Sequence, residues 1–317
     1  MDELVFCPHS VNISNLSAIS TSQSALEEER ICEIAELAAA ATEFTRHVQD
    51  AGMTPYEALL LIADASFFDA CDCVHGDALS DNRVRLEKYL SALSLIDKAT
   101  FCELYVGFLS ERGIKISEKD FLVQRVAPES FVYVKNPYSD EAYDVFSQDF
   151  IDPRLKYVLS FKEALKAVYD DDATYCLLPL EEGGARIPSV ARMLFDSDLK
   201  INAVTPVFGF DGSADMKYAL IAKHFNIPPV ARDDDRYLEI RLSTDSTSSV
   251  VDVLNIAELY GSGLYRINTV NFESEGGQHT YLSVVFCDEG ADFTSLLVYL
   301  TLFVTDFSLI GIYKNLE

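Results

Sequence analysis

The spacing of apolar residues changes near residue 131, from helical spacing to short apolar runs. Upstream, Ser24 and Thr54 each open a helical pattern with capping-box spacing, and Pro55 occupies the first helical position of the second pattern. Downstream, short apolar strands alternate with helical segments, which is typical of α/β layering with a largely parallel sheet. The chain is therefore expected to change fold class along its length, from all-helical to mixed α/β.

These patterns divide the chain into four parts, with a linker before the last part. We expect a loose tail at residues 1–23, an all-helical domain at 24–120 and an α/β lobe at 121–230. A linker rich in Pro and Asp covers 226–236. The last part, 237–317, has the order strand, helix, strand, strand, helix, strand, which is the ferredoxin-like βαββαβ unit. The expected fold class is thus a multidomain α+β and α/β protein.

The individual elements follow from apolar period and capping signals. Expected helices share helical spacing and cover 24–51, 54–74, 83–93, 100–112, 139–150, 160–169, 188–195, 248–260 and 293–303. Expected strands share short apolar runs and cover 131–134, 157–159, 175–180, 200–207, 218–223, 237–242, 264–272, 280–287 and 309–313.

The charge balance limits the partners that the chain can bind. It has 51 acidic and 25 basic side chains and a formal net charge of −26. This charge repels phosphate backbones and anionic lipid headgroups, so we expect neither a nucleic-acid nor a membrane partner. An anionic substrate would need a local basic site or a helix N-terminus that overrides the general field.

Cysteine usage indicates the compartment. The seven cysteines are an odd number scattered through apolar segments, which is typical of free thiols in a reducing environment. The N-terminus lacks a signal-peptide pattern, and no run of about 18 uncharged apolar residues could span a bilayer. We therefore predict a cytoplasmic protein.

Two motifs in the C-terminal unit resemble a known family. Asp245 to Val250 lie between its first strand and helix, and its second strand reads Ile-Asn at Ile267 and Glu-Ser at Glu273. Both resemble motifs of the regulatory ACT domain that ends prephenate dehydratases. The family's arginine and proline after Glu-Ser are Glu275 and Gly276 here, and a loop glycine is Ser248.

The ACT resemblance implies a ligand and a partner. In the family, this loop and the Glu-Ser region of a neighbouring subunit enclose a free amino acid, usually phenylalanine, and ACT units commonly pair edge to edge into homodimers. The residues implied here are Asp245, Ser246, Ser248, Ser249, Val250, Glu273 and Ser274. Helix-start N–H groups and hydroxyls would receive the ligand carboxylate, while Asp245 or Glu273 would take the ammonium. Alternatively, the loop is only a helix N-cap with redundant capping residues.

The α/β lobe resembles the catalytic part of the same family. Tyr175 to Gly183 resembles a family strand and loop, Ser160 to Asp171 the segment before it, and Asn136-Pro137 a shortened form of the first glycine-rich loop. The resemblance runs from about Phe131 to Glu317.

The lobe departs from the family where the chemistry lies. The family's threonine-arginine-phenylalanine motif is matched by Met216, Lys217 and Tyr218. The Met216 thioether has no proton to donate, and Lys217 lacks the bidentate grip of a guanidinium. Only about ten residues, 208–217, stand where the family has a second lobe, so the cleft lacks an opposite wall unless another subunit or the helical domain supplies one.

Glycines before an expected helix suggest a second ligand position. Glu182, Gly183, Gly184 and Arg186 precede Pro188, and free backbone N–H groups there would receive an anion with help from Arg186. Alternatively, these residues form a tight strand-to-helix turn with solvated charges.

The N-terminal helices carry two further motifs. Cys71, Cys73 and His75 invite a metal site, but four convergent ligands are lacking, so we expect buried helix cysteines, no metal and no cofactor. Bifunctional enzymes of the family carry a chorismate mutase domain at this place, and Leu26 to Arg30 faintly resembles its opening. Such a site needs convergent cations, for which the candidates are Arg30, Arg46, Arg83, Arg85 and Lys88. A structural or dimerising helical domain is the alternative.

Three functions remain open. The first is a non-catalytic relative of prephenate dehydratase that senses a small amino or aromatic acid through a dimeric ACT unit. The second is an enzyme, either an active prephenate dehydratase or a bifunctional chorismate mutase and dehydratase of phenylalanine biosynthesis. The third is a structural dimerisation protein.

Overall fold

The structure is a computed structural model of the chain. It describes residues 21–71, 77–122, 130–150, 152–208, 216–225, 236–243, 250–274, 277–288, 293–304 and 307–314.

The first part of the described chain is helical. Its helices are α1 (Thr21–Asp50), α2 (Pro55–Ala63), α3 (Ala65–Asp69), α4 (Asp77–Ala92), α5 (Leu95–Glu111) and the short 3-10 helix η2 (Glu118–Phe121). Capping boxes start α2 at Thr54 with Glu57, and α5 at Ser94 with Asp97.

The predicted continuous helix over 54–74 is wrong. Asp64 adopts an extended backbone, and its carboxylate accepts hydrogen bonds from the N–H groups of Ser66 and Phe67, which caps α3. A capping side chain inside an apolar run thus ends one helix and starts the next. Residues 72–76, which include two members of the predicted cysteine and histidine motif, lie outside the described residues.

Strands and helices alternate in the middle of the chain. They are β1 (Ser130–Val134), α6 (Pro137–Phe146), the 3-10 helix η3 (Ser147–Asp149), β2 (Arg154–Val158), α7 (Phe161–Tyr169), β3 (Tyr175–Glu182), β4 (Ala185–Arg186), α8 (Pro188–Ser197), β5 (Lys200–Val207) and β6 (Met216–Ala222). The strands β2, β1 and β3 are parallel neighbours, as predicted. However, β6 lies antiparallel between β3 and β5, because the connection over 208–215 is too short for a crossover helix.

The C-terminal part has the predicted order of elements. These are β7 (Arg236–Ser243), α9 (Val250–Leu259), β8 (Ser262–Ser274), β9 (Gly277–Asp288), α10 (Thr294–Phe303) and β10 (Phe307–Lys314). The neighbouring pairs β10–β7, β7–β9 and β9–β8 are all antiparallel. This strand order, with the first and third strands in the middle, is that of a ferredoxin-like sheet.

The described strands form one ten-stranded sheet. Its order is β2-β1-β3-β6-β5-β10-β7-β9-β8, with β4 paired to β3. The two halves meet where Gly311 of β10 faces Ile201 of β5. A Cβ atom at position 311 would lie 2.7 Å from the Ile201 backbone oxygen, so only glycine permits this approach.

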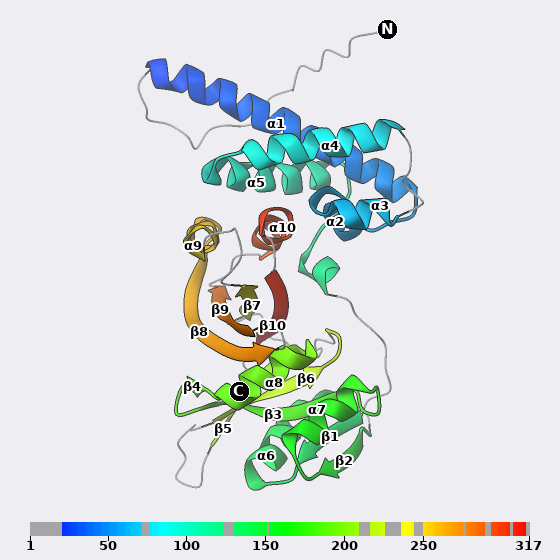
Figure 1. Ribbon diagram of the computed structural model, residues 1–317, viewed down its shortest axis with the longest axis vertical. Coiled ribbons are helices and arrows are strands. Elements are labelled where there is room, and N and C mark those ends of the chain that lie inside the picture. The colour runs from blue at the N-terminus through cyan, green and yellow to red at the C-terminus, as the bar shows by residue number, and fades with distance from the viewer. Residues whose placement is uncertain are drawn as a thin grey trace.

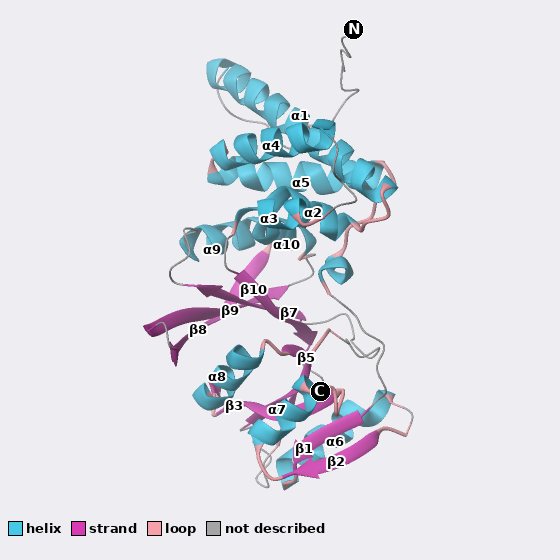
Figure 2. Cartoon of the chain, turned by 45° about the vertical axis from the view of Figure 1, so that its right-hand side comes forward, coloured by secondary structure: helices cyan, strands magenta, loops and turns pink. Residues whose placement is uncertain are grey.

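The helical part packs on the C-terminal part through one shared core. Helices α9 and α10 lie between α5 and the strands β7 to β10, and α8 lies below β8 (Figures 1 and 2). The Phe101 and Phe303 rings meet edge to face at 6.3 Å, and the Tyr260 hydroxyl donates to the Ala99 carbonyl at 2.9 Å. Two further cores lie on opposite faces of the part of the sheet formed by β1 to β6. One core contains side chains of α7 and α8, and the other contains side chains of α6.

In the part of the chain that the structure describes, no helix combines the length and the apolar character that a membrane crossing requires.

Candidate functional site

The predicted residues Met216, Lys217 and Tyr218 lie where β6 begins and the neighbouring strands β3 and β5 end. They open β6, and Lys217 is in register with Pro206 of β5 and Glu181 of β3. In open α/β sheets, ligands bind outside the carboxyl ends of the parallel strands. The structure therefore places Met216, Lys217 and Tyr218 where a ligand would enter such a sheet.

The first N–H groups of α6, the helix beside these residues, already donate hydrogen bonds within the chain. Asn136 caps α6, and its side-chain oxygen accepts from the N–H groups of Tyr138 and Ser139. The Tyr218 hydroxyl also lies 3.5 Å from that oxygen, and burial first of all raises the pKa of Tyr218. A helix N-terminus that is capped in this way has fewer free donors for an anion.

The two glycines that the sequence singled out form a hairpin turn. Gly183 and Gly184 have φ of 56° and 76°, and they join β3 to β4 with Glu182 opposite Ala185. Positive φ at both central residues is typical of a two-residue type I′ turn, which explains why glycine stands at each position. The turn lies open to its surroundings, because no heavy atom lies within 4 Å of a Cβ placed on either glycine.

Arg186 points away from that turn. Its side chain is 5% exposed and makes an ion pair with Glu239 of β7, and Glu181 is also buried. The alternative with solvated charges is therefore wrong for Arg186, because the carboxylates of Glu181 on β3 and Glu239 on β7 pair with its buried guanidinium instead. Glu182, in contrast, is exposed.

Arg186 belongs to a buried cluster of charges between the two halves of the sheet, which we call the junction cluster. Its members come from β3, β4, β6, β7, β8, β9 and β10: Glu181, Arg186, Lys217, Glu239, Arg266, Ser283 and Tyr313.

Glu239 is the most enclosed carboxylate of the junction cluster. Its Oε1 accepts from the Ser283 hydroxyl at 2.8 Å, and its Oε2 accepts from Arg186 and from the Tyr313 hydroxyl, the latter at 2.9 Å. Burial alone would raise the pKa of Glu239, but Arg186 and the two hydroxyls outweigh burial and hold this pKa below its usual value. Burial, and then Glu239, raise the pKa of Tyr313 well above 10.

Glu181 is the second carboxylate and contacts three cations. Arg266 Nη1 lies 2.5 Å from Glu181 Oε1. Arg186 Nη1 lies 3.8 Å from the same oxygen, and Lys217 Nζ lies 3.8 Å from Glu181 Oε2. Lys217 thus already has a carboxylate partner in the chain itself. The arrangement fixes charged side chains across the sheet junction and leaves Lys217 less free to bind a substrate carboxylate.

Glu239 and Arg266 were not predicted from the sequence as site residues. A signal for Glu239 was present, because Glu239 and Arg241 alternate with Leu238 and Ile240 along β7. Alternation of period two places both charges on the same face of the strand.

The predicted ACT ligand residues are only partly described. Asp245, Ser246, Ser248 and Ser249 lie outside the described residues, and Val250 is the first residue of α9. Glu273 and Ser274 end β8, in register with Gln278 and Gly277 of β9. Their convergence on one ligand therefore stays a prediction.

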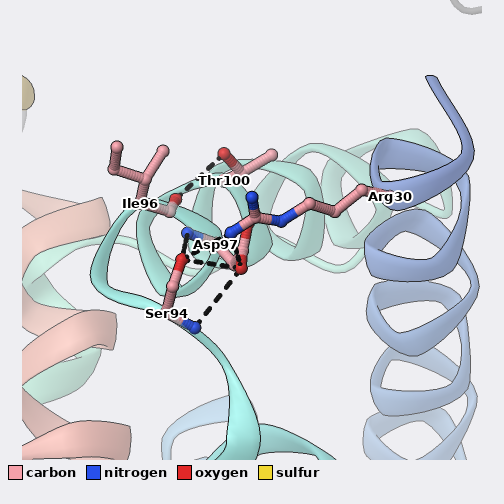
Figure 3. A network of polar contacts seen from close by, with 5 residues as sticks. All are labelled: Arg30, Ser94, Ile96, Asp97 and Thr100. Atoms are coloured by element: carbon pink, nitrogen blue, oxygen red, sulfur yellow. Dashed lines mark hydrogen bonds and ion pairs between the residues drawn. The ribbon is translucent and has the colours of Figure 1, made fainter. Parts of the chain in front are cut away.

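Three of the five candidate cations of the N-terminal helices have an acidic partner that the structure describes. Arg30 of α1 contacts Asp97 and Ser94 at the start of α5 (Figure 3). Burial would raise the pKa of Asp97, but the hydrogen bonds from Arg30 and Ser94 lower it below its usual value. The other two pairs, Arg46 with Glu43 and Arg83 with Glu87, each lie within a single helix.

No group of three or more His, Cys, Asp or Glu side chains that could hold a metal ion occurs among the residues that the structure describes.

Comparison with known proteins gives a likeness to solved structures alone. No family model matches the chain, and no curated protein matches it. Prephenate dehydratase from Streptococcus mutans is similar at 13% identity, over 60% of this chain and 100% of that chain, with a TM-score of 0.48. Prephenate dehydratase from Arthrobacter aurescens, in complex with L-Phe, is similar at 11% identity, over 58% and 90%, with a TM-score of 0.45.

A third solved structure has another activity. GqqA, described as a novel type of quorum quenching acylase, is similar at 16% identity, over 58% of this chain and 94% of that chain, with a TM-score of 0.43. At identities this low and TM-scores below 0.5, the likeness assigns neither an activity nor a ligand to this chain.

Proposed function

We propose that the chain is a non-catalytic, regulatory relative of prephenate dehydratase that binds a small amino acid or aromatic acid through a dimeric ACT unit at 237–317. The observation that carries the proposal is the strand order β10-β7-β9-β8, antiparallel throughout, with α9 and α10 on one face. Together with the Ile-Asn and Glu-Ser residues of β8, this arrangement fits an ACT domain.

The free edge of the sheet supports a homodimer. Among the described strands, β8 pairs only with β9, so its other edge has backbone groups available to a second chain. Leu264 and Ile267 of β8 are 49% and 40% exposed, and Val251 and Leu259 of the adjacent α9 are 60% and 56% exposed. Apolar side chains beside an unpaired strand suit edge-to-edge pairing with a second copy.

The lobe supports a non-catalytic role. Met216 cannot donate a proton, Lys217 contacts Glu181, and β5 has β6 on one side and β10 on the other. The short 208–215 connection leaves no room for a second lobe that would exclude water from a reacting substrate. These features favour binding over lyase chemistry.

A reducing, cytoplasmic setting is part of the proposal. The described cysteines are free: Cys32, Cys71, Cys102, Cys176 and Cys287. Cys102 and Cys176 are buried, and burial raises the pKa of both thiols, which disfavours the reactive thiolate.

The ligand is tested with the purified full chain. We expect at least one of phenylalanine, tyrosine, tryptophan and phenylpyruvate to raise the melting temperature, since a ligand that binds only the folded state stabilises it. Prephenate and chorismate should remain unconverted in the same preparation. Turnover of either compound would replace the proposal with the enzyme alternative, and a dimer without any ligand response would favour the structural alternative.

The dimer is tested with a charge at the free edge. Ile267→Lys places a cation at the proposed pairing edge and should convert the dimer to a monomer in sedimentation experiments. Leu159→Lys is the matched control, because Leu159 is 91% exposed beyond β2, at the opposite end of the sheet. A variant dimer as stable as the wild type, or a monomeric wild type, would contradict pairing through β8.

A further inference from the structure

A small cavity lies on the face of β7 that points away from α9 and α10. Its lining includes Glu239, Arg241, Ser283 and Asn268 from the sheet, while Leu194 contributes from α8. The cavity volume is about 40 Å³, which holds a few water-sized species and is too small for an aromatic acid. Because α8 packs against both β8 and β3, the cavity lies at the junction of the two halves of the sheet (Figure 1).

Two buried donors at this cavity lack an acceptor among the residues that the structure describes. Arg186 and Asn268 both line it, and neither Arg186 Nη1 nor Asn268 Nδ2 has a hydrogen-bond partner, although each atom is inaccessible to solvent. The Arg186 side chain is 5% exposed, so bulk water does not solvate it. Buried donors without a partner are rare in folded proteins, and a small acceptor in the cavity would satisfy both.

Neither of the two described carboxylates that pair with Arg186 supplies that acceptor. Both oxygens of Glu239 accept other hydrogen bonds, from Ser283 on one side and from Arg186 Nη2 and Tyr313 on the other. Glu181 lies 3.8 Å from Arg186 Nη1, beyond hydrogen-bond distance, and contacts Arg266 more closely.

The surroundings of the cavity are cationic. Of the charged side chains that line it, Glu239 is acidic, whereas Arg186 and Arg241 are basic. This local excess of positive charge among the described lining residues, in a chain of net charge −26, favours an anion here.

We propose that the cavity binds a small monoanion of the size of formate or a halide, through Arg186 Nη1 and Asn268 Nδ2. The anion completes the hydrogen bonding of two buried donors and offsets part of the excess charge. Since Arg186 belongs to β4 and Asn268 to β8, the bound anion joins the lobe to the ferredoxin-like sheet. This site is separate from the proposed amino-acid site and does not depend on it.

The first test uses added anions at constant ionic strength. Formate or bromide replaces gluconate, which is too large for the cavity, and thermal unfolding of the full chain is followed. We expect a saturable rise in Tm of about 2–4 °C for formate and bromide, and none for benzoate. An equal response to all three anions would indicate general salt effects and overturn the site.

The second test supplies the anion by substitution. Asn268→Asp keeps the side-chain shape but adds a carboxylate beside Arg186, so we expect a higher Tm than wild type and no further response to formate. Asn202→Asp is the control, since the buried Asn202 amide donates to the carbonyls of Lys200 and His224, and a carboxylate there faces oxygen atoms. This control should lower Tm and keep the formate response.

The opposite pattern would refute the proposal. If Asn268→Asp lowers Tm at neutral pH and the formate response persists, the cavity does not favour negative charge. Crystals soaked in bromide locate the ion directly: anomalous density between Arg186 and Asn268 is expected, and bromide confined to the protein surface would overturn the assignment.

Discussion

Replacing Gly311 by alanine probes the contact that joins the two halves of the sheet. The new Cβ would lie 2.7 Å from the Ile201 oxygen and 2.8 Å from Tyr313 Cδ1, whereas ordinary contact begins at 3.4 Å. Strand β10 would therefore have to move away from β5 by roughly 0.7 Å to restore normal contact. Both strands are buried here, so the shift disturbs the packing on each side of the sheet.

The expected loss of stability follows from two opposing effects. Overpacking of a buried position costs about 1–3 kcal/mol. Alanine also restricts the unfolded chain more than glycine does, which returns about 0.4–1 kcal/mol. Gly311→Ala should therefore lower the free energy of unfolding by about 1–2 kcal/mol, measured by urea denaturation.

Gly107 provides the matched control. It lies in the interior of α5, is exposed and has nothing within 4 Å of a Cβ atom. Gly107→Ala should raise the free energy of unfolding by about 0.5–1 kcal/mol, because alanine favours a helix interior. If Gly311→Ala is as stabilising as Gly107→Ala, β5 and β10 are not in contact and the continuous sheet is refuted.

Three further perturbations test the packing and charge assignments by urea unfolding. Arg186→Met should cost about 3–5 kcal/mol because it leaves Glu239 buried without a counter-charge, and adding Glu239→Gln should recover most of that loss; additive losses would contradict the pairing. The lowered pKa of Asp97 makes its stabilisation fully present above its unfolded pKa, about 4, and lost as pH falls through the lower folded value. The stability gap between wild type and Asp97→Asn should thus shrink as pH falls from about 5 to 2, and a constant gap would refute it. Thr54→Ala should cost about 1 kcal/mol through the lost capping box of α2, and an unchanged stability would show that the box is not formed.

Local signals in the sequence predicted most elements of the fold. The capping box at Thr54 and Pro55 marks the start of α2, and the period change near residue 131 marks the first strand. These features depend on residues a few positions apart, which is why they can be read without tertiary information. The order of elements in the C-terminal part follows for the same reason.

Contacts between distant segments were not predictable in the same way. From the sequence, the helical part and the C-terminal part were expected as separate domains, whereas Phe101 and Phe303 lie in one core. Likewise, Arg186 was expected at an anion cradle, because its neighbours in sequence are glycines. Its actual partner, Glu239, is 53 residues away, and no local pattern encodes that pairing.

Titration calorimetry of the full chain with phenylalanine, tyrosine and tryptophan tests the sensing role most directly. We predict saturable binding of at least one of these amino acids, with affinity lost in a chain whose Asp245 and Glu273 are replaced by alanine. No heat of binding for any of them, in a preparation that converts prephenate to phenylpyruvate, would contradict the proposal.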